Sequence, residues 1–438
     1  MIHLANILIA ADDPAVAQDL LQKIRRHGYD GRSVASYEAA LATAQQEHPD
    51  IVLTTETLAG GSALALAKAL KAQPECSEIP LCLAASERSI DTKSEALAAG
   101  FDDVLSAPIA ETKLVARLRP LVRLAVMRGE LHQRVKTARR FGIEVNDMLV
   151  QRDVPKDYPV LVVGPNAQSI APQLPDAALS FAADPYLADD LLGRNNFDAA
   201  ILLPDDNPQP YLDLCAQARN NPKLFNLPVI ILTRPDLIGE DVAYHHGASG
   251  FMTTPLDYRE LQISVLAMVR RQQLRWKIRD ALNQTLQGST RDAGTNLFSR
   301  AFLDAYLADR VDFSVAHGRH LSIMFFALPD IEGVRVRFGE DQANHLRLQA
   351  TQWITGLLRG EDVTARFGQN EFCVVLPDTP REEAEVVMNR IAGVLAYTDF
   401  AVKDVYQPVK IWARVGAADL HPGDTADALV ARAREHMA

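Results

Sequence analysis

The chain has 438 residues, which is too long for one ordinary domain of roughly 150 residues and predicts about three folded units. Its hydrophobic fraction of 48% and charged fraction of 23% exclude a disordered or collagen-like chain. A net charge of -11 opposes broad attraction to nucleic acid or anionic lipid, so we expect no nucleic-acid partner.

The four cysteines and the amino-terminal segment indicate the cellular compartment. The cysteines are scattered without Cys-x-x-Cys spacing, and Cys82 and Cys373 lie in apolar, strand-like runs, which predicts reduced core residues. The first residues lack a basic leader, and Asp12 and Asp13 interrupt the apolar run that a signal peptide needs. No apolar stretch approaches the roughly 20 residues that span a bilayer. We therefore expect a cytoplasmic protein without membrane insertion.

Short apolar segments alternate with helix-length segments through the first two thirds of the chain. Segments that are apolar on both faces are typical of strands in a buried parallel sheet, and the alternation with helices is typical of a doubly wound α/β fold. The predicted strands of the first unit are 7–10, 51–53, 81–83 and 104–105, with a helix over 62–72.

The landmarks of this unit return later in the chain, which indicates a duplication. We expect one α/β unit in residues 1–140 and a second in 157–287, each ending in a long helix. The apolar stripe of these helices favours pairing with another helix, and hence a homodimer. The second helix also carries a basic stretch, for which a solvated surface is the expected role rather than phosphate binding: Arg270, Arg271, Arg275, Lys277 and Arg279. The matching landmarks are Asp50 with Asp198, Pro80 with Pro228 and Pro108 with Pro255.

Residues 288–438 form a third predicted unit with a mixed α/β pattern. A hairpin turn at 368–371 joins its two last predicted strands. The predicted helices are 298–307, 346–358 and 381–395, and the predicted strands are 321–328, 363–367 and 372–376.

Two motifs in this third unit carry a family resemblance. They are Asp292-Ala293-Gly294-Thr295-Asn296-Leu297 at its entrance and Arg366-Phe367-Gly368-Gln369-Asn370-Glu371-Phe372 at the hairpin. With the duplicated α/β units, the whole chain resembles two response-regulator receiver domains followed by a GGDEF domain, as in PleD-type diguanylate cyclases. The resemblance implies two tandem flavodoxin-like receiver domains and a mixed-sheet, nucleotidyl-cyclase-like GGDEF domain.

The resemblance also implies receivers that have lost their chemistry. A receiver needs an aspartate nucleophile and an acidic pair that holds Mg²⁺. Here the acceptor positions are Thr55 and Leu203, so neither copy is expected to be phosphorylated on aspartate. Glu56, or Asp205 with Asp206, would replace the acceptors only if the register slips, and we expect them to be surface turn residues.

The GGDEF domain shows equivalent losses. The positions that resemble metal ligands are Ala327 and Asn370, and Gln369 replaces the second glycine of the hairpin. Methyl and amide groups cannot replace two carboxylates around a divalent cation. Positions that hold the guanine base in the family are Arg335 and Asn344. We expect no cyclase activity, no metal and no cofactor.

One binding motif remains, Arg359-Gly360-Glu361-Asp362, which resembles the R-x-x-D allosteric site at which GGDEF domains bind cyclic di-GMP. A guanidinium offers a planar fork to guanine or phosphate, and a carboxylate accepts hydrogen bonds from guanine. Arg390 resembles a secondary contact to the same ligand. The ordinary alternative is an exposed Arg-Asp ion pair worth at most about 1 kcal/mol.

The whole pattern resembles the degenerate, PopA-like branch of the PleD family, whose members are cyclic di-GMP effectors. Such proteins localise to a cell pole and deliver cell-cycle regulators to the ClpXP protease through adaptor proteins. The leading hypothesis is therefore an inactive cyclic di-GMP receptor that recruits protein partners. The alternatives are a residual diguanylate cyclase and a docking scaffold that binds no ligand.

Overall fold

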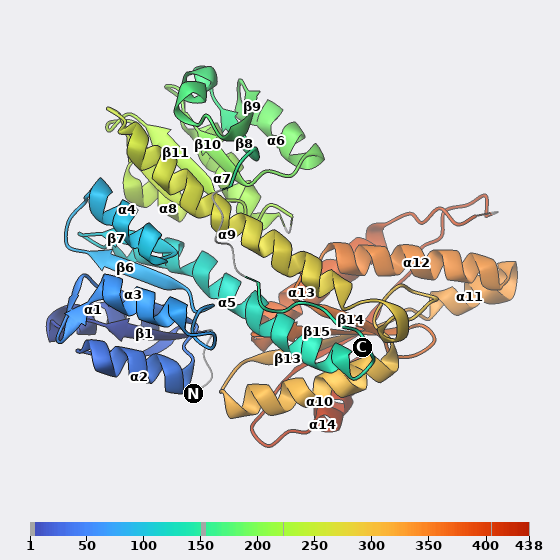
Figure 1. Ribbon diagram of the computed structural model, residues 1–438. Coiled ribbons are helices and arrows are strands. Elements are labelled where there is room, and N and C mark those ends of the chain that lie inside the picture. Colours follow the sequence, from blue (N-terminus) through green and yellow to red (C-terminus); the bar gives the residue numbers. More distant parts are fainter. Residues whose placement is uncertain (1–4, 150–154, 222, 404, 438) are drawn as a thin grey trace. The chain divides into compact units, whose positions relative to one another are not determined.

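The computed structural model describes residues 5–149, 155–221, 223–403 and 405–437 (Figure 1). The chain divides into two compact units. One unit contains residues 5–125 and 149–277, and the other contains residues 126–148 and 278–438. The boundaries between the units fall within the two long helices α5 (Glu111–Arg139) and α9 (Tyr258–Gln284), whose carboxyl-terminal parts therefore belong to the same unit as the third predicted domain.

The first α/β domain is built on a five-stranded parallel sheet with the order β2-β1-β3-β6-β7. Its central strands are buried on both faces, as their uniformly apolar sequences predict. The elements that precede α5 are β1 (Asn6–Ala10), α1 (Pro14–Arg25), β2 (Asp30–Val34), α2 (Tyr37–Glu47), β3 (Ile51–Thr55), β4 (Thr57–Leu58), β5 (Gly61–Ser62), α3 (Ala63–Ala72), β6 (Leu81–Ala85), α4 (Ile90–Ala99) and β7 (Asp103–Ser106).

The second α/β domain repeats this winding, with the strand order β9-β8-β10-β11-β12. Matching hydrogen bonds recur, because Val52 N–H donates to Pro80 O at 3.0 Å and Ala200 N–H donates to Pro228 O at 2.8 Å. The predicted duplication of the fold is thus confirmed. The elements before α9 are β8 (Tyr158–Val163), the 3₁₀ helix η1 (Ala167–Gln173), β9 (Ala177–Ala182), α6 (Pro185–Arg194), β10 (Ala199–Leu202), α7 (Gln209–Asn220), β11 (Val229–Thr233), α8 (Glu240–His245) and β12 (Gly250–Thr253).

A buried ion cluster joins the two α/β domains, which lie in the same compact unit. Asp103 at the start of β7 is 2% exposed and accepts from Arg117 Nε at 2.8 Å, while Nη1 of Arg271 lies 3.0 Å from the same carboxylate. Arg117 also donates to the carbonyl of Ser249 at 2.8 Å. Arg275 donates to the carbonyl oxygens of Asn226 and Pro120, both at 3.0 Å.

The expected solvated surface is therefore wrong for Arg271 and Arg275, which are buried at the contact between the two domains. Sequence patterning assigns arginines to solvent by default, whereas burial depends on which carbonyls and carboxylates the other domain presents. The apolar stripes of α5 and α9 are likewise buried within this single chain, for example Leu118 and Val265 at 0% exposure. The stripes therefore no longer support a homodimer. The homodimer stays a prediction.

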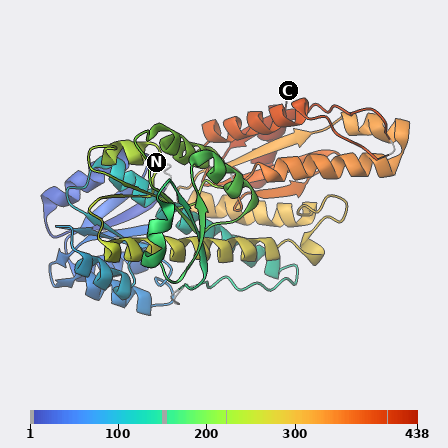
Figure 2. The same cartoon turned by 90° about the horizontal axis from the view of Figure 1, so that it is seen from above.

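The third domain is built on a four-stranded antiparallel sheet with the order β14-β15-β13-β16. Because side chains alternate along β13, Met324 and Phe326 pack against residues of α11, α12 and α13, while Ile323 and Phe325 pack against residues of α10 and α14. Figure 2 shows this domain from above, in orange and red. Its elements are η2 (Gly288–Thr290), α10 (Arg300–Ala316), β13 (Leu321–Ala327), α11 (Asp330–Phe338), α12 (Glu340–Gly356), β14 (Val363–Arg366), β15 (Glu371–Pro377), α13 (Arg381–Tyr397), β16 (Arg414–Asp419) and α14 (Ala426–Glu435).

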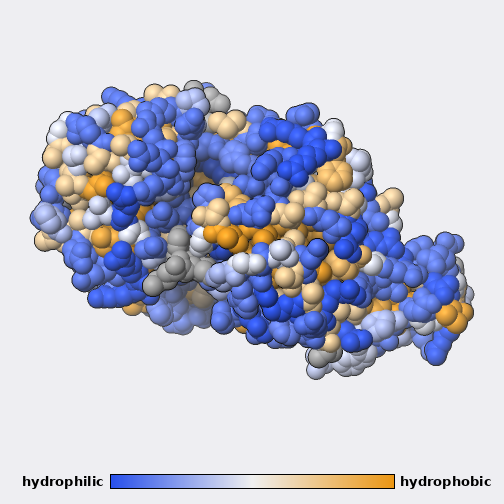
Figure 3. Space-filling model, turned by 90° about the horizontal axis from the view of Figure 1, so that it is seen from below, coloured by the Kyte–Doolittle hydropathy of each residue, from blue (hydrophilic) through white to orange (hydrophobic). Residues whose placement is uncertain are grey.

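All four cysteines are buried and unpaired by disulfides, as the sequence predicts. The face of the molecule in Figure 3 is largely hydrophilic, with apolar residues in limited patches. Within the described residues, every helix is too short or too polar to cross a bilayer.

Candidate functional site

The turn between α12 and β14 carries the predicted R-x-x-D motif. Asp362 Oδ2 accepts from the backbone N–H of Arg359 at 2.7 Å, and the backbone N–H of Asp362 donates to Arg359 O at 3.2 Å. This reciprocal pair closes a tight turn in which Asp362 is half-buried and Arg359 is exposed. One oxygen of Asp362 therefore holds the turn, whereas the Arg359 guanidinium extends from it.

Helix α13 brings further charges to this turn, from Arg390 and Glu383. Arg390 donates from Nη2 at 3.0 Å to the carbonyl oxygen of Leu357, two residues before Arg359. Nη2 of Arg359 lies 3.7 Å from a carboxylate oxygen of Glu383, and both side chains are partly solvated, at 39% and 53% exposure. An ion pair of that length and exposure is worth less than about 1 kcal/mol and is readily exchanged for a ligand. The structure thus brings Arg359, Asp362 and Arg390 together around one turn.

The two middle residues of the motif differ in exposure, because Gly360 is exposed and Glu361 is buried. Glu361 is 3% exposed, and its carbonyl oxygen accepts from Arg134 Nη2 of α5 at 2.7 Å. A Cβ atom on Gly360 would lie 3.3 Å from Cγ of Arg279 in α9, so a side chain at this position would press on that helix. Glu361 is therefore a buried residue of the turn and Gly360 an exposed one, and their contact with the ligand stays a prediction.

A buried polar cluster fixes Arg134, and sequence reasoning missed it. Glu130, at 0% exposure, accepts from Arg134 Nε at 2.9 Å and from Tyr306 Oη at 2.9 and 2.8 Å. Burial raises the pKa of the Glu130 carboxyl above its ordinary value, although Arg134 opposes that effect. The only local signal was Glu130 four residues before Arg134 on one helix, a spacing that is common on solvated helices.

The positions that resemble metal ligands lie at the hairpin between β14 and β15. Ala327 ends β13 opposite Glu371, and Asn370 lies in the turn. The amide oxygen of Asn370 accepts from Arg347 at 3.2 Å from Nε and at 3.1 Å from Nη2. Arg347 is 2% exposed and also donates to Asn344. A buried guanidinium thus lies within hydrogen-bond distance of the position where the family resemblance implies a metal ligand, and its charge repels a divalent cation.

The hairpin turn is held by the entrance motif of the domain. Arg366 donates from Nε to Gly368 O at 3.2 Å, and its Nη1 lies 3.3 Å from the carboxylate of Asp292. The two motifs that carried the family resemblance therefore meet in space. Gln369 is exposed at the tip of this turn.

The acidic residues near the hairpin have protein partners, and so does Arg335, which is at a position that resembles a base contact. Glu371 pairs with Arg434 at 3.2 Å, and Asp330 accepts from the backbone N–H of Trp412 at 2.8 Å. Arg335 forms an ion pair with Glu332. Across the described ranges, no cluster of three or more His, Cys, Asp or Glu side chains is arranged to hold a metal ion.

In the first α/β domain, Thr55 lies at the carboxyl end of β3, where a receiver carries its acceptor. Its hydroxyl donates to Thr57 O at 3.0 Å. The next residue, Glu56, accepts from Ser86 at 2.8 Å from the backbone N–H and at 2.5 Å from the hydroxyl. Asp12 accepts from the hydroxyl of Thr57 at 3.1 Å. The carboxylates at this edge of the sheet are thus tied to hydroxyl groups.

The second α/β domain carries an apolar residue at the same edge. Leu203 follows β10, and a Cβ atom on Gly164 would lie 2.3 Å from Leu203 O, so this edge is closed by backbone contact. Asp205 caps the backbone N–H of Asn207 at 2.9 Å, and Asp206 pairs with Arg234 on the surface at 2.9 Å. Both aspartates occupy surface turns, as expected from the sequence.

Comparison with known proteins assigns two of these domains. Residues 289–438 match the diguanylate cyclase, GGDEF domain family, and residues 7–119 match the response regulator receiver domain family. The chain combines a receiver domain with a GGDEF domain. It is also 26% identical over 456 aligned residues to the response regulator PleD of Caulobacter vibrioides, a match that covers 98% of this chain and 96% of PleD. GGDEF homology and the likeness to PleD indicate a role in cyclic di-GMP signalling.

Two further relatives match a smaller share of the chain. The probable diguanylate cyclase DgcC of Escherichia coli K12 is 29% identical over 103 residues, which is 24% of this chain and 28% of DgcC. The GGDEF domain of DgcB from Caulobacter crescentus, solved in complex with cyclic di-GMP, is 17% identical and has a TM-score of 0.33. That match covers 34% of this chain and 85% of the DgcB chain.

Proposed function

We propose that the chain is a cyclic di-GMP receptor without cyclase activity, a degenerate, PopA-like relative of PleD in which the second α/β domain is a second receiver. The observation that carries the proposal is the meeting of Arg359, Asp362 and Arg390 at one turn. There the Arg359 guanidinium is solvated and weakly paired, so it can turn to the guanine or phosphate of the ligand.

The second half of the proposal is the loss of catalysis. Two-metal or one-metal phosphoryl chemistry needs carboxylates at the end of β13 and in the hairpin. The side chain of Ala327 offers no ligand atom, and the side-chain oxygen of Asn370 accepts from the Arg347 guanidinium. These contacts support an inactive domain that has kept a ligand site.

A calorimetric titration of the full chain with cyclic di-GMP tests the receptor function. We expect Arg359→Ala to raise the Kd by about tenfold or more, because a bidentate arginine contact to guanine is worth about 1–3 kcal/mol. Arg337→Ala is the matched control, since Arg337 is an exposed arginine on α11 of the same domain. Equal affinity of wild type and Arg359→Ala would refute the proposed site.

Incubation of the full chain with GTP and Mg²⁺ or Mn²⁺ tests the loss of catalysis. We expect no cyclic di-GMP above the level of a reaction without protein. Sustained formation of the dinucleotide would instead establish a residual cyclase with atypical metal ligands.

Partner recruitment follows from the family resemblance. We propose that the ligand-bound chain presents its receiver surfaces to protein partners, including protease adaptors of the ClpXP pathway, at a cell pole. A ligand controls such recruitment only through different affinities for two arrangements of the chain. We therefore expect that a fluorescent fusion carrying Arg359→Ala no longer concentrates at the cell pole. If the fusion still concentrates there, the protein is a scaffold whose localisation does not depend on the ligand.

A further inference from the structure

The carboxyl-terminal part of α5 contacts the backbone of the R-x-x-D turn, although the two are 227 residues apart in the chain. The Nη2 atom of Arg134 donates to the carbonyl oxygen of Glu361 at 2.7 Å. Both residues are 3% exposed, so this hydrogen bond is shielded from water. A guanidinium donor makes the bond charge-assisted and therefore stronger than a bond between neutral groups. α5 thus holds the turn at a point between Arg359 and Asp362 in the chain.

Two contacts with α10 fix the helix that carries Arg134. The Glu130 carboxylate is 0% exposed and accepts both from Arg134 Nε at 2.9 Å and from the Tyr306 hydroxyl of α10. One turn after Arg134, the hydroxyl of Thr137 donates to Asp309 of α10 at 3.3 Å. Because Arg134 is held in this way, a displacement of α5 along α10 moves the donor that holds the Glu361 carbonyl.

The end of α9 contacts the neighbouring residue of the same turn. A Cβ atom on Gly360 would lie 3.3 Å from Cγ of Arg279, so the glycine lets the turn approach this helix closely. The carboxyl-terminal parts of α5 and α9 belong to the same compact unit as the turn. The two middle residues of the motif therefore contact the two long helices, whereas the proposed ligand contacts Arg359 and Asp362 flank them.

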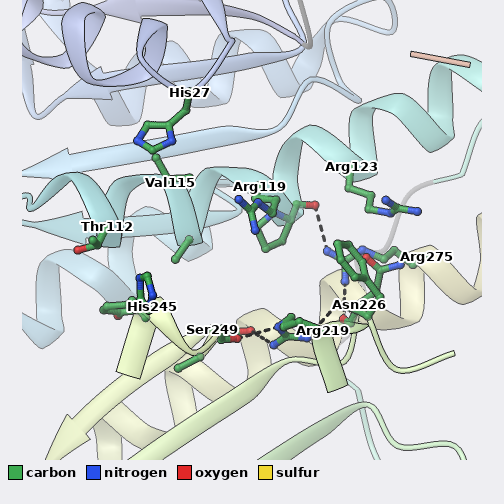
Figure 4. A pocket seen from close by; sticks show the side chains of 16 residues that line it. His27, Thr112, Val115, Arg119, Arg123, Arg219, Asn226, His245, Ser249 and Arg275 are labelled. Atoms are coloured by element: carbon green, nitrogen blue, oxygen red, sulfur yellow. Dashed lines mark hydrogen bonds between the residues drawn. The ribbon is translucent and has the colours of Figure 1, made fainter. Parts of the chain in front are cut away.

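The same helix α5 contributes side chains to the contact between the two α/β domains. Thr112, Arg119 and Arg123 line a pocket whose other wall comes from the second α/β domain (Figure 4). This pocket lies within the compact unit that contains both α/β domains. α5 is one continuous helix from Glu111 to Arg139. Its amino-terminal part therefore belongs to the packing of the α/β domains, and its carboxyl-terminal part belongs to the packing of the ligand turn.

We propose that α5 regulates the affinity of the R-x-x-D turn for its ligand and that Arg134 is the positioning residue. This inference rests on the proposed function, because it concerns the same cyclic di-GMP site. A ligand that engages Arg359 and Asp362 fixes the turn, and with it the carbonyl group to which Arg134 donates. Coupling between two sites is reciprocal. The ligand therefore stabilises the packing of α5, and a displacement of α5 weakens ligand binding.

Hydrogen–deuterium exchange of the full chain, with and without saturating cyclic di-GMP, tests the coupling. We expect the ligand to slow amide exchange about fivefold or more both in the turn, residues 358–363, and in residues 130–139 of α5. Arg359→Ala at the same ligand concentration should show neither change. Slower exchange in the turn with unchanged exchange in residues 130–139 would overturn the inference and leave the receptor function intact. Absence of binding by the wild-type chain in the calorimetric titration would remove both.

A pair of variants separates positioning of the turn from general destabilisation. Arg134→Met removes the donor to Glu361 O and should raise the Kd for cyclic di-GMP about tenfold. Arg432→Met is the matched control, because Arg432 of α14 likewise donates to a backbone carbonyl, that of Asp419 at 2.6 Å.

The control contact lies far from the turn, since β14 and β16 are at opposite edges of the sheet. We expect Arg432→Met to lower the melting temperature and to leave the Kd unchanged. An unchanged Kd in Arg134→Met, or an equal rise of the Kd in both variants, would contradict a positioning role. The exchange measurement on the wild-type chain decides the question even if Arg134→Met does not fold.

Discussion

Replacement of Asp103 by asparagine tests the ion cluster that joins the two α/β domains. The carboxylate is 2% exposed and contacts the guanidinium groups of Arg117 and Arg271, whose side chains are 10% and 8% exposed. Asparagine keeps the size of the side chain but removes the negative charge. Two buried cations then lose their counter-ion, and removal of one partner from a buried ion pair costs about 3–5 kcal/mol.

The pKa of Asp103 gives a second, smaller value for the contribution of this carboxylate to the free energy of unfolding. Burial raises this pKa, but Arg117 and Arg271 outweigh burial and lower it from 3.8 to about 2. A lowered carboxyl pKa contributes stability that is complete above the unfolded-state pKa and is lost between about pH 4 and pH 2. The shift corresponds to about 2 kcal/mol. The Asp103→Asn substitution should lower the free energy of unfolding by more than this, because it also removes the counter-ion of two buried guanidinium groups. We therefore expect a loss of about 3 kcal/mol.

The assay is thermal unfolding of the full chain at pH 7, measured by differential scanning calorimetry. A loss of about 3 kcal/mol lowers the melting temperature of a unit of this size by roughly 6–12 °C. Asp190→Asn is the matched control, since Asp190 forms an exposed ion pair with Arg194 on α6 and should shift the transition by less than about 3 °C. Equal shifts in the two variants, or no shift in Asp103→Asn, would refute the reasoning.

Three further predictions concern other parts of the fold. Gly164→Ala should lower the melting temperature by several degrees, because the φ angle is +141° and a Cβ atom would lie 2.3 Å from Leu203 O; an unchanged transition would contradict this. Glu130→Ala should destabilise the chain by about 3–5 kcal/mol and weaken cyclic di-GMP binding through Arg134, whereas Glu130→Gln should do less of both; calorimetry and titration measure the two effects. The four thiols should react with Ellman's reagent only after denaturation, because all are buried and burial raises the pKa of Cys215 to about 11; rapid labelling of the native chain would disprove it.

Sequence patterns determined the fold of the α/β domains because the relevant signals are local. Apolar strands such as 51–53 and 81–83 alternate with helical segments, and that period is set by the backbone. The repeated landmarks predicted a second copy with the same strand order. In the third domain, the predicted strands and hairpin appear, but β16, α11 and α14 carry no pattern that predicted them.

Part of the candidate site could also be predicted from the sequence. The R-x-x-D motif predicts a turn with an arginine and an aspartate, because a short Asp side chain can cap a backbone N–H three residues earlier. Contacts between segments that are distant in the chain could not be predicted from the sequence. Arg347 and Asn370, or Arg134 and Glu361, become neighbours only when helices pack on the sheet.

The sequence by itself determined the alternation of strands and helices, the duplication, the buried cysteines and the altered motifs. Tertiary structure decided which charges are buried. Arg271 and Arg275 belong to a basic stretch that is typical of a solvated helix face, yet both are buried against the neighbouring domain. Arg119 and Arg219 line one pocket although a hundred residues separate them in the chain. The physical reason is that helical period and turn chemistry act over a few residues, whereas burial and electrostatic potential depend on every segment that packs nearby.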